Sequence, residues 1–159
     1  ALLIANKAHG RYHIIAGDMN ADCPQFAWAD ESVILPPAHD PYFIEFLISL
    51  CRKKFCKAVF YGCEPDLKEI SIHRQLFKNE DIFLPLNPQE LIYDCLDKIK
   101  TGKLLSELNL NPPRWIETDD INSFDKIDFF PVIVKPAIGA GGSNHCYVAQ
   151  NLAELNALS

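Results

Sequence analysis

The stretch that decides the fold is FFPVIVKPAIGAGGSNHCYVA, which runs from Phe129 to Ala149. An apolar, β-branched segment leads to one lysine, Lys135, and the loop after it holds three of the chain's seven glycines. A second apolar segment returns from the loop, so the pattern predicts two strands joined by a glycine-rich connection. Backbone N–H groups of glycines can approach an anion closely, and a fixed lysine adds positive charge. The stretch therefore predicts a site for a nucleotide's phosphates.

The loop differs from two familiar phosphate-binding loops. A P-loop carries its lysine after the glycines and leads into a helix, whereas Lys135 precedes them and a strand follows. The dinucleotide-binding fingerprint needs a third glycine at a spacing that Gly139, Gly141 and Gly142 do not provide. Taken alone, the stretch leaves open an ordinary β-hairpin with a flexible glycine turn.

Composition indicates a globular protein of one domain, or of one domain and part of another. The chain has 159 residues, of which 48% are hydrophobic and 23% are charged. Its net charge is −6 and no block of Lys and Arg stands free of acidic residues, which argues against nucleic acid or a membrane surface as the partner. No apolar stretch approaches the roughly 20 residues needed to span a bilayer. With no recognisable signal peptide, we expect a cytoplasmic protein.

Six cysteines raise the question of a metal site or of disulfides. They are Cys23, Cys51, Cys56, Cys63, Cys95 and Cys146. No Cys-x-x-Cys pair occurs, and no pair of histidines with ligand spacing lies near them. We therefore predict no metal site and expect buried, free thiols in a reducing compartment.

Along the rest of the chain, short apolar strands alternate with amphipathic helices. The predicted strands are 12–17, 33–35, 58–61 and 82–84. The predicted helices are 1–9, 41–54, 65–76, 88–100 and a short one from 152. Capping residues are expected at the starts of three of them, at Asp40, Asn87 and Asn151. This alternation predicts an α/β fold with a Rossmann-like parallel sheet.

The pattern looks incomplete at both ends. The chain begins in a predicted helix, although a doubly wound sheet normally begins with a strand. The helix that Asn151 should start runs out within about two turns. We expect the chain to be an interior piece of a larger protein.

Five short phrases occur in order before the glycine loop. They are Gly17-Asp18-Met19-Asn20, Ala29-Asp30-Glu31, Asp40-Pro41-Tyr42-Phe43-Ile44, Gly62-Cys63-Glu64-Pro65-Asp66-Leu67, and Asp97-Lys98 with the later Thr101, Leu104-Leu105 and Pro112-Pro113. Each phrase is weak by itself. In this order, and followed by PVIVKP and the loop, they resemble the ATP-grasp superfamily over nearly the whole chain. The resemblance is to its carbamoyl-phosphate-synthase-like and biotin-carboxylase-like branches.

The resemblance implies three parts. They are a Rossmann-like pre-ATP-grasp domain over 1–94, the incomplete start of the ATP-grasp domain over 95–128, and a partial antiparallel β lid subdomain over 129–159. Lys135 matches the lysine that reaches the nucleotide, and Lys98 matches a basic residue that also faces it. A solvated helical lysine is the alternative for Lys98. The residues that match the loop over the triphosphate are Gly139, Gly141, Gly142 and Ser143.

The resemblance also implies a ligase that uses ATP and Mg²⁺ to convert a carboxylate into an acyl phosphate, which an amine then attacks. Family members hold magnesium with two Glu and an Asn beyond the lid, so the metal ligands are expected outside this segment. No catalytic residue is assigned within the segment, which by itself should be inactive and bind nucleotide weakly. The implied partners are small-molecule carboxylate and amine substrates, and a homo-oligomer is compatible with the resemblance.

Two other functions stay open at this point. Asp18 ends a predicted strand, as the ribose ligand of a Rossmann-type oxidoreductase does, but no glycine fingerprint precedes it and a role in a turn fits better. The other is a non-catalytic α/β module that serves only assembly. The residues upstream of Ala1 would decide the first, and ATP protection that depends on Lys135 would exclude the second.

Overall fold

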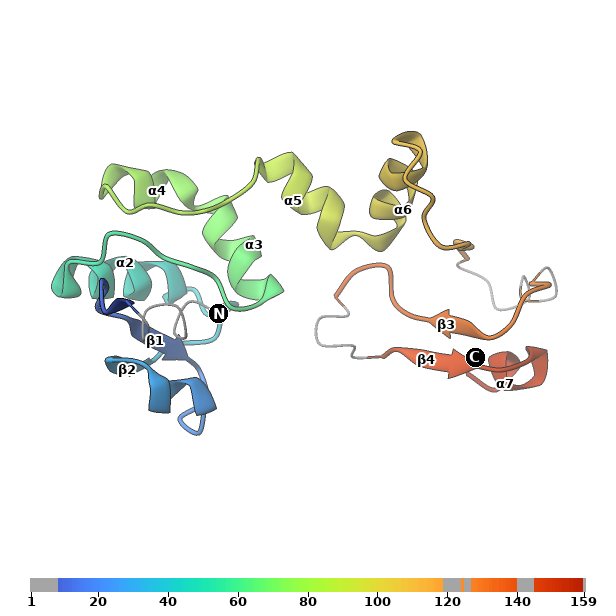
Figure 1. The fold of residues 1–159 in the computed structure, drawn as a ribbon, viewed down its shortest axis with the longest axis horizontal. Helices are drawn as coiled ribbons and strands as arrows, with labels where there is room; N and C mark the ends of the chain where they lie inside the picture. The colour runs from blue at the N-terminus through green and yellow to red at the C-terminus, as the bar shows by residue number, and fades with distance from the viewer. Residues whose placement is uncertain (1–8, 119–123, 125–126, 140–144, 159) are drawn as a thin grey trace. The chain divides into compact units, whose positions relative to one another are not determined.

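The computed structural model describes residues 9–118, 124, 127–139 and 145–158 (Figure 1). The chain divides into two compact units, Ala1–Pro85 and Leu86–Ser159, which we call the N-terminal and C-terminal units and describe separately. The helix predicted at 1–9 lies outside the described residues except for its last one. Gly10, which follows it, has a φ of +56°, the left-handed conformation common just after a helix. In the described part of the chain, no helix is long and apolar enough to span a membrane.

Two parallel strands, β1 (Ile15–Asp18) and β2 (Glu31–Ile34), form the sheet of the N-terminal unit. Their register runs from Ile15↔Glu31 to Asp18↔Ile34, and the short helix η1 (Pro24–Trp28) lies in the connection between them. The strands overlap those predicted at 12–17 and 33–35. The predicted parallel pairing is therefore confirmed for these two strands.

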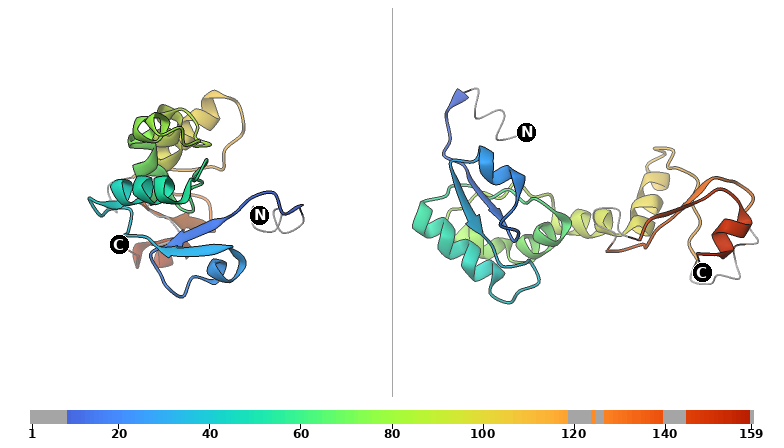
Figure 2. Two further views of the ribbon diagram at one scale, coloured as in Figure 1. Left: turned by 90° about the vertical axis from the view of Figure 1, so that its left-hand side faces the viewer. Right: turned by 90° about the horizontal axis from the view of Figure 1, so that it is seen from below.

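Helix α2 (Phe43–Lys54) supplies much of the core of this unit and lies along one face of the β1–β2 sheet (Figure 2). Its buried side chains recur at helical spacing, as the sequence predicts: Phe43, Ile44, Leu47, Ile48 and Cys51. The predicted N-cap at Asp40 is wrong, because the N-cap residue is Tyr42. The Asp40 carboxylate instead accepts a hydrogen bond from the Tyr42 N–H (2.8 Å), which forms a turn ahead of the helix.

The strands predicted at 58–61 and 82–84 are reduced to one isolated parallel bridge between Ala58 and Phe83. A hydrogen bond from the Val59 N–H to Phe83 O (3.0 Å) belongs to it. The side chains of Phe60 and Phe83 are exposed, whereas Ile82 beside the bridge is only 6% exposed. Among the described residues the two segments pair over a single bridge with no third strand beside it, so the prediction of two full strands is wrong here.

The single helix predicted at 65–76 is in fact two helices, α3 (Glu64–Ile72) and α4 (Arg74–Asn79). They meet at His73, whose ring Nδ1 lies 3.0 Å from Glu69 O. A side chain that bonds to a backbone carbonyl one turn back competes with the regular helical ladder. The prediction missed this junction because the apolar spacing continues across it.

In the C-terminal unit, the helix predicted at 88–100 is also two helices, α5 (Gln89–Leu96) and α6 (Lys98–Glu107). The predicted N-cap at Asn87 is wrong, since the N-cap position of α5 falls on Pro88. The break comes at Asp97, whose φ of −99° and ψ of 114° are extended.

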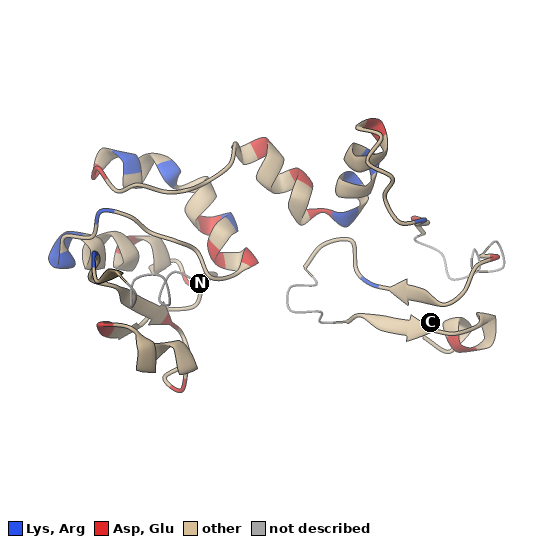
Figure 3. Ribbon diagram, in the orientation of Figure 1, with Lys and Arg blue, Asp and Glu red and all other residues tan. Residues whose placement is uncertain are grey.

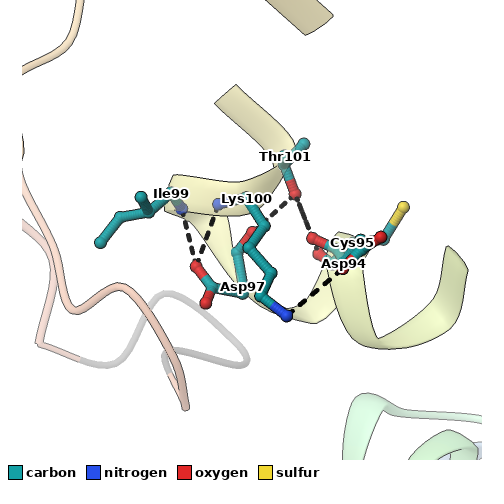
Figure 4. Close-up of polar contacts among 6 residues, drawn as sticks. All are labelled: Asp94, Cys95, Asp97, Ile99, Lys100 and Thr101. Carbon is teal, nitrogen blue, oxygen red and sulfur yellow. Dashed lines mark hydrogen bonds and ion pairs between the residues drawn. The ribbon is translucent and has the colours of Figure 1, made fainter. Parts of the chain in front are cut away.

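Asp97 and Thr101 build the corner between α5 and α6 (Figure 4). Asp97 Oδ1 accepts hydrogen bonds from the N–H groups of Ile99 (2.9 Å) and Lys100 (3.2 Å), which makes Asp97 the N-cap of α6. The Thr101 hydroxyl lies 2.8 Å from Asp97 O and 2.9 Å from Asp94 O, and it can donate to either carbonyl. This corner sets where α6 begins.

We expect replacement of Asp97 by alanine to destabilise the C-terminal unit by about 0.5–2 kcal/mol, because two N–H groups of α6 lose their acceptor. Urea unfolding followed by circular dichroism measures the loss. Asp94→Ala is the matched control, since the Asp94 carboxylate makes an exposed ion pair with Lys100 (3.4 Å) that contributes little. Equal losses in the two variants would contradict the capping role of Asp97.

The rest of the C-terminal unit is a pair of strands and a short helix. β3 (Val132–Val134) and β4 (Tyr147–Ala149) pair in the register Val132↔Ala149 to Val134↔Tyr147, which confirms the predicted antiparallel pair. The predicted cap of α7 (Leu152–Asn156) is also confirmed, because Asn151 Oδ1 accepts from the Glu154 N–H (3.0 Å). The buried residues under the strands are Phe124, Ala149 and Leu155.

Trp115 fixes the segment after α6 to that helix. Gly102 of α6 is buried, and a β-carbon built on it would lie 2.8 Å from Trp115 Cε2. Only a glycine therefore lets the indole lie directly against the helix backbone. The ion pair between Lys103 and Glu117 (3.4 Å) joins the same two segments.

Substitution of Gly102 by valine should destabilise the C-terminal unit by about 1–3 kcal/mol, because the new side chain displaces the indole of Trp115. Thermal unfolding followed by circular dichroism tests this. Gly62→Val serves as the control, because the atom nearest to a β-carbon there is Asp66 Oδ2, at an ordinary 3.8 Å. If both variants melt like the wild type, the close contact between Gly102 and Trp115 is not a constraint on the fold.

Candidate functional site

Lys135 follows β3 directly and is exposed. Along this strand, Val132 and Val134 pack against the core, whereas Ile133 is 67% exposed. Lys135 continues the alternation, which places it on the same face as Ile133. Val148, the register partner of Ile133, is 58% exposed. The outer face of the strand pair, formed by Ile133, Lys135 and Val148, is thus apolar and carries one positive charge.

Lys98 is held next to the segment that follows Lys135. Its backbone N–H donates a hydrogen bond to Ala137 O (2.9 Å), across a long separation in sequence. Lys98 is the first residue of α6, and Asp97 caps the N-terminal end of that helix. The structure therefore brings together the two chain segments that carry the predicted lysines. The Lys98 side chain is half-buried.

The charges of the C-terminal unit single out the same two lysines. Among its described residues, three basic side chains each pair with a carboxylate: Lys100 with Asp94, Lys103 with Glu117, and Arg114 with Asp128. Within that described part, Lys98 and Lys135 form no ion pair. Figure 3 shows acidic and basic segments interspersed along α5 and α6 and few charges on β3 and β4. Neighbouring cations without a counter-charge favour the binding of an anion.

Only the first part of the predicted glycine loop lies within the described residues. Gly139 has a φ of +80°, which L side chains rarely adopt, and no atom lies within 4 Å of a β-carbon built on it. Among the described residues, there is therefore free space on the side of Gly139 where a β-carbon would lie. Gly141, Gly142 and Ser143 lie outside the described residues, so their role in a phosphate site stays a prediction.

The apolar part of the outer face was missed from the sequence. Ile133 and Val148 were counted only as strand residues. A signal was present, because an antiparallel strand with one solvated face normally alternates apolar and polar residues, whereas Val132–Val134 is apolar throughout.

Asp18 behaves as a turn residue, as predicted. Its Oδ1 accepts a hydrogen bond from the Asn20 N–H (2.8 Å) just after β1. Although Cys63 is exposed, partial desolvation raises the pKa of its thiol, and the nearby carboxylates of Asp66 and Asp18 raise it further. The use of the Asp18 carboxylate within this turn supports a turn role over that of a ribose ligand.

All six cysteines are free thiols, as predicted. The expected burial is wrong for most of them, because only Cys51 is buried while Cys63 and Cys95 are exposed. In the described part of the chain, no group of three or more His, Cys, Asp or Glu side chains could hold a metal ion.

Comparison with known proteins shows which family the chain matches and which solved structures share its fold. The family described as PylC-like, N-terminal domain, matches residues 1–84, so the match ends next to the end of the N-terminal unit at Pro85. No curated protein matches the chain.

The solved structures that share the fold include two biotin carboxylases. The biotin carboxylase of Campylobacter jejuni, solved as a β,γ-ATP complex, has a TM-score of 0.61 and 21% identity, over 98% of this chain and 36% of that one. The biotin carboxylase domain of the 2-oxoglutarate carboxylase of Hydrogenobacter thermophilus, a dimer with MgADP, ADP and bicarbonate, has a TM-score of 0.60 and 19% identity. That match covers 97% of this chain and 35% of the carboxylase domain. The chain thus spans about a third of the length of either structure.

The fold of both units agrees with the N-terminal region of biotin carboxylase, a mixed α/β arrangement with short parallel and antiparallel sheets. The family match covers more than half of the 159 residues. The chain therefore belongs to the PylC-like N-terminal domain family, a pre-ATP-grasp family of the ATP-grasp superfamily.

Proposed function

We propose that the chain is the N-terminal part of an ATP-dependent ligase that joins a carboxylate to an amine, or of a related carbamoyl-phosphate-synthase-like enzyme. The observation that carries the proposal is the hydrogen bond from the Lys98 N–H to Ala137 O. It brings the first residue of α6 to the base of the glycine loop, two residues after Lys135. Two lysines from separate segments thereby border one loop.

The residues at this site fit a nucleoside triphosphate. Lys98 and Lys135 are the basic residues of the described C-terminal unit without a carboxylate partner, so they are available to compensate phosphate charge. The free space at Gly139 lets backbone N–H groups approach an anion. Ile133 and Val148 offer an apolar surface of the kind that covers the flat face of a base.

ATP, when bound with Mg²⁺, would supply the phosphoryl group that activates the carboxylate as an acyl phosphate. The contribution of this chain is to bind and orient. Lys98 and Lys135 compensate negative charge, and the backbone of the glycine loop, which is expected to include Gly141, Gly142 and Ser143, adds donors at the same place. We expect the magnesium ligands elsewhere in the full-length protein.

We further propose the division into a pre-ATP-grasp domain over 1–94, the start of the ATP-grasp domain over 95–128 and part of its lid over 129–159. The end of the N-terminal unit at Pro85 lies inside the first of these ranges. The antiparallel pairing of β3 with β4 supports a small β subdomain in the last.

The reaction class can be tested by trapping the acyl phosphate. The full-length protein is incubated with ATP, Mg²⁺ and a panel of amino acids and dicarboxylates, with hydroxylamine in place of the amine. Hydroxylamine attacks an acyl phosphate and gives a hydroxamate, which a ferric chloride assay detects. We expect hydroxamate formation that requires ATP and one carboxylate of the panel. ADP release with no hydroxamate from any carboxylate would contradict a carboxylate-activating ligase.

A further inference from the structure

Helix α2 ends in a Schellman motif. Phe55, just past the helix, is left-handed, with φ 54° and ψ 35°. Its N–H donates to Arg52 O (3.3 Å), and the next N–H, that of Cys56, donates to Cys51 O (2.9 Å). These two bonds define the motif, and they turn the chain sharply back over the last turn of the helix.

A Schellman motif places the side chain of the residue after the left-handed position against the side chain five residues earlier. In most helices this contact joins two hydrophobic residues, whereas here it joins two thiols. Burial raises the pKa of Cys51 to about 12, and the neighbouring Cys56 thiol contributes to this rise. Cys51 is only 3% exposed, while Cys56 is half-buried and open to small reagents.

We infer that Cys51 and Cys56 form a site of reversible oxidation, in which the two thiols are converted into an intramolecular disulfide. The contact is set by backbone hydrogen bonds rather than by flexible side chains, so the thiols are already neighbours before any reaction. A disulfide needs Cα atoms within about 7 Å, and a helix end closed in this way brings its residues that near. The bond would join the last turn of α2 to the segment that leads to the Ala58–Phe83 bridge.

The co-reactant is a small-molecule disulfide, such as oxidised glutathione. The thiolate of the more accessible Cys56 attacks one sulfur of the reagent, which forms a mixed disulfide and releases one glutathione thiolate. The Cys51 sulfur, after loss of its proton to solvent, then attacks Sγ of Cys56, and the second glutathione leaves as a thiolate. Two protein thiols are oxidised to one disulfide, and one oxidised glutathione is reduced to two thiols. The burial of Cys51 makes the second step the slower one.

Peptide mapping tests the inference directly. The intact protein is equilibrated with oxidised and reduced glutathione, and its free thiols are then blocked with iodoacetamide. It is next digested with trypsin and with a protease that cleaves after glutamate. Cleavage after Glu45 and after Arg52, Lys54 and Lys57 leaves peptides 46–52 and 55–57. We expect these two peptides to be joined by a disulfide, and the number of free thiols among the six cysteines of residues 1–159 to fall to four.

Cys56→Ser should abolish the joined species, because the hydroxyl cannot form the bond. Cys63→Ser is the matched control, since it removes an exposed thiol from the same unit and should leave the joined species intact. The wild-type measurement needs no variant, so it decides the question even if Cys56→Ser fails to fold. The inference is overturned if Cys51 and Cys56 are both recovered alkylated in the oxidised wild type, or if either appears joined to another cysteine instead.

Discussion

In the full-length enzyme proposed above, replacing Lys135 by alanine should lower kcat/KM about 100- to 1,000-fold. Loss of one positioned donor to a transferring group typically costs this much in an active site. Lys135 is exposed on the outer face of the strand pair and contributes little to the core, so the fold should be unchanged. Steady-state assays of ADP release and a circular dichroism spectrum measure the two effects.

Lys103→Ala is the matched control for this substitution. It removes the same charge from the same unit, but Lys103 lies on α6 and pairs with Glu117. We expect its kcat/KM to stay within about twofold of the wild type, as for an ordinary surface substitution. Similar losses in Lys103→Ala and Lys135→Ala would mean that general charge, rather than a site at Lys135, governs the activity.

Replacing Phe77 by alanine should destabilise the N-terminal unit by about 3–5 kcal/mol. Phe77 lies in α4 and is 0% exposed, so its removal leaves a cavity as well as losing the burial of a large ring. A loss of this size is a large part of the total stability of a small domain. Chemical unfolding in urea, followed by circular dichroism, should show a lower midpoint.

The adjacent Leu76 gives the control for Phe77. It occupies the same helix but is 47% exposed, so Leu76→Ala should lose no more than about 1 kcal/mol. If the two variants were equally stable, Phe77 would not be a central core residue of this unit.

The parts of the fold that could be predicted from the sequence are those fixed by local pattern. Helix α2 carries an apolar stripe at helical spacing, and the pair Asn151 and Glu154 has the spacing of a helix cap. The strands around the glycine loop are apolar and follow each other along the chain, and the sequence between them has no helical pattern that could serve as a parallel crossover, so an antiparallel pair is expected. In each case the deciding residues lie close together along the chain.

The wrong predictions concern helix ends and strands that depend on particular side chains. The spacing of apolar residues does not reveal the effect of those side chains. His73 and Asp97 break helices whose apolar pattern continues past them, because each makes a hydrogen bond to the nearby backbone. The strand pair near Ala58 and Phe83 failed for a different reason. Both segments have strand-forming residues and Ile82 is buried, but the pairing stops at a single bridge and the aromatic side chains of Phe60 and Phe83 stay exposed.

The candidate site was predicted only through individual residues. The resemblance to a superfamily pointed to Lys98 and Lys135. The hydrogen bond that joins their segments, however, connects residues far apart in the sequence and has no local signature. The absence of ion pairs at these two lysines, within the described residues, likewise depends on which carboxylates fold near them. Contacts of this kind are set by tertiary structure and become visible only with it.

The most direct test of a nucleotide site between Lys98 and Lys135 is the binding of ATP itself. Isothermal titration of the full-length protein with ATP and Mg²⁺ should be run on the wild type, Lys98→Ala, Lys135→Ala, the double variant and the control Lys103→Ala. We predict that each single variant raises Kd at least about tenfold, because a charge-assisted hydrogen bond to phosphate is worth about 1.5–3 kcal/mol. The double variant should differ from the sum of the singles, as expected for groups that share one ligand. Wild-type affinity in both single variants would contradict the account.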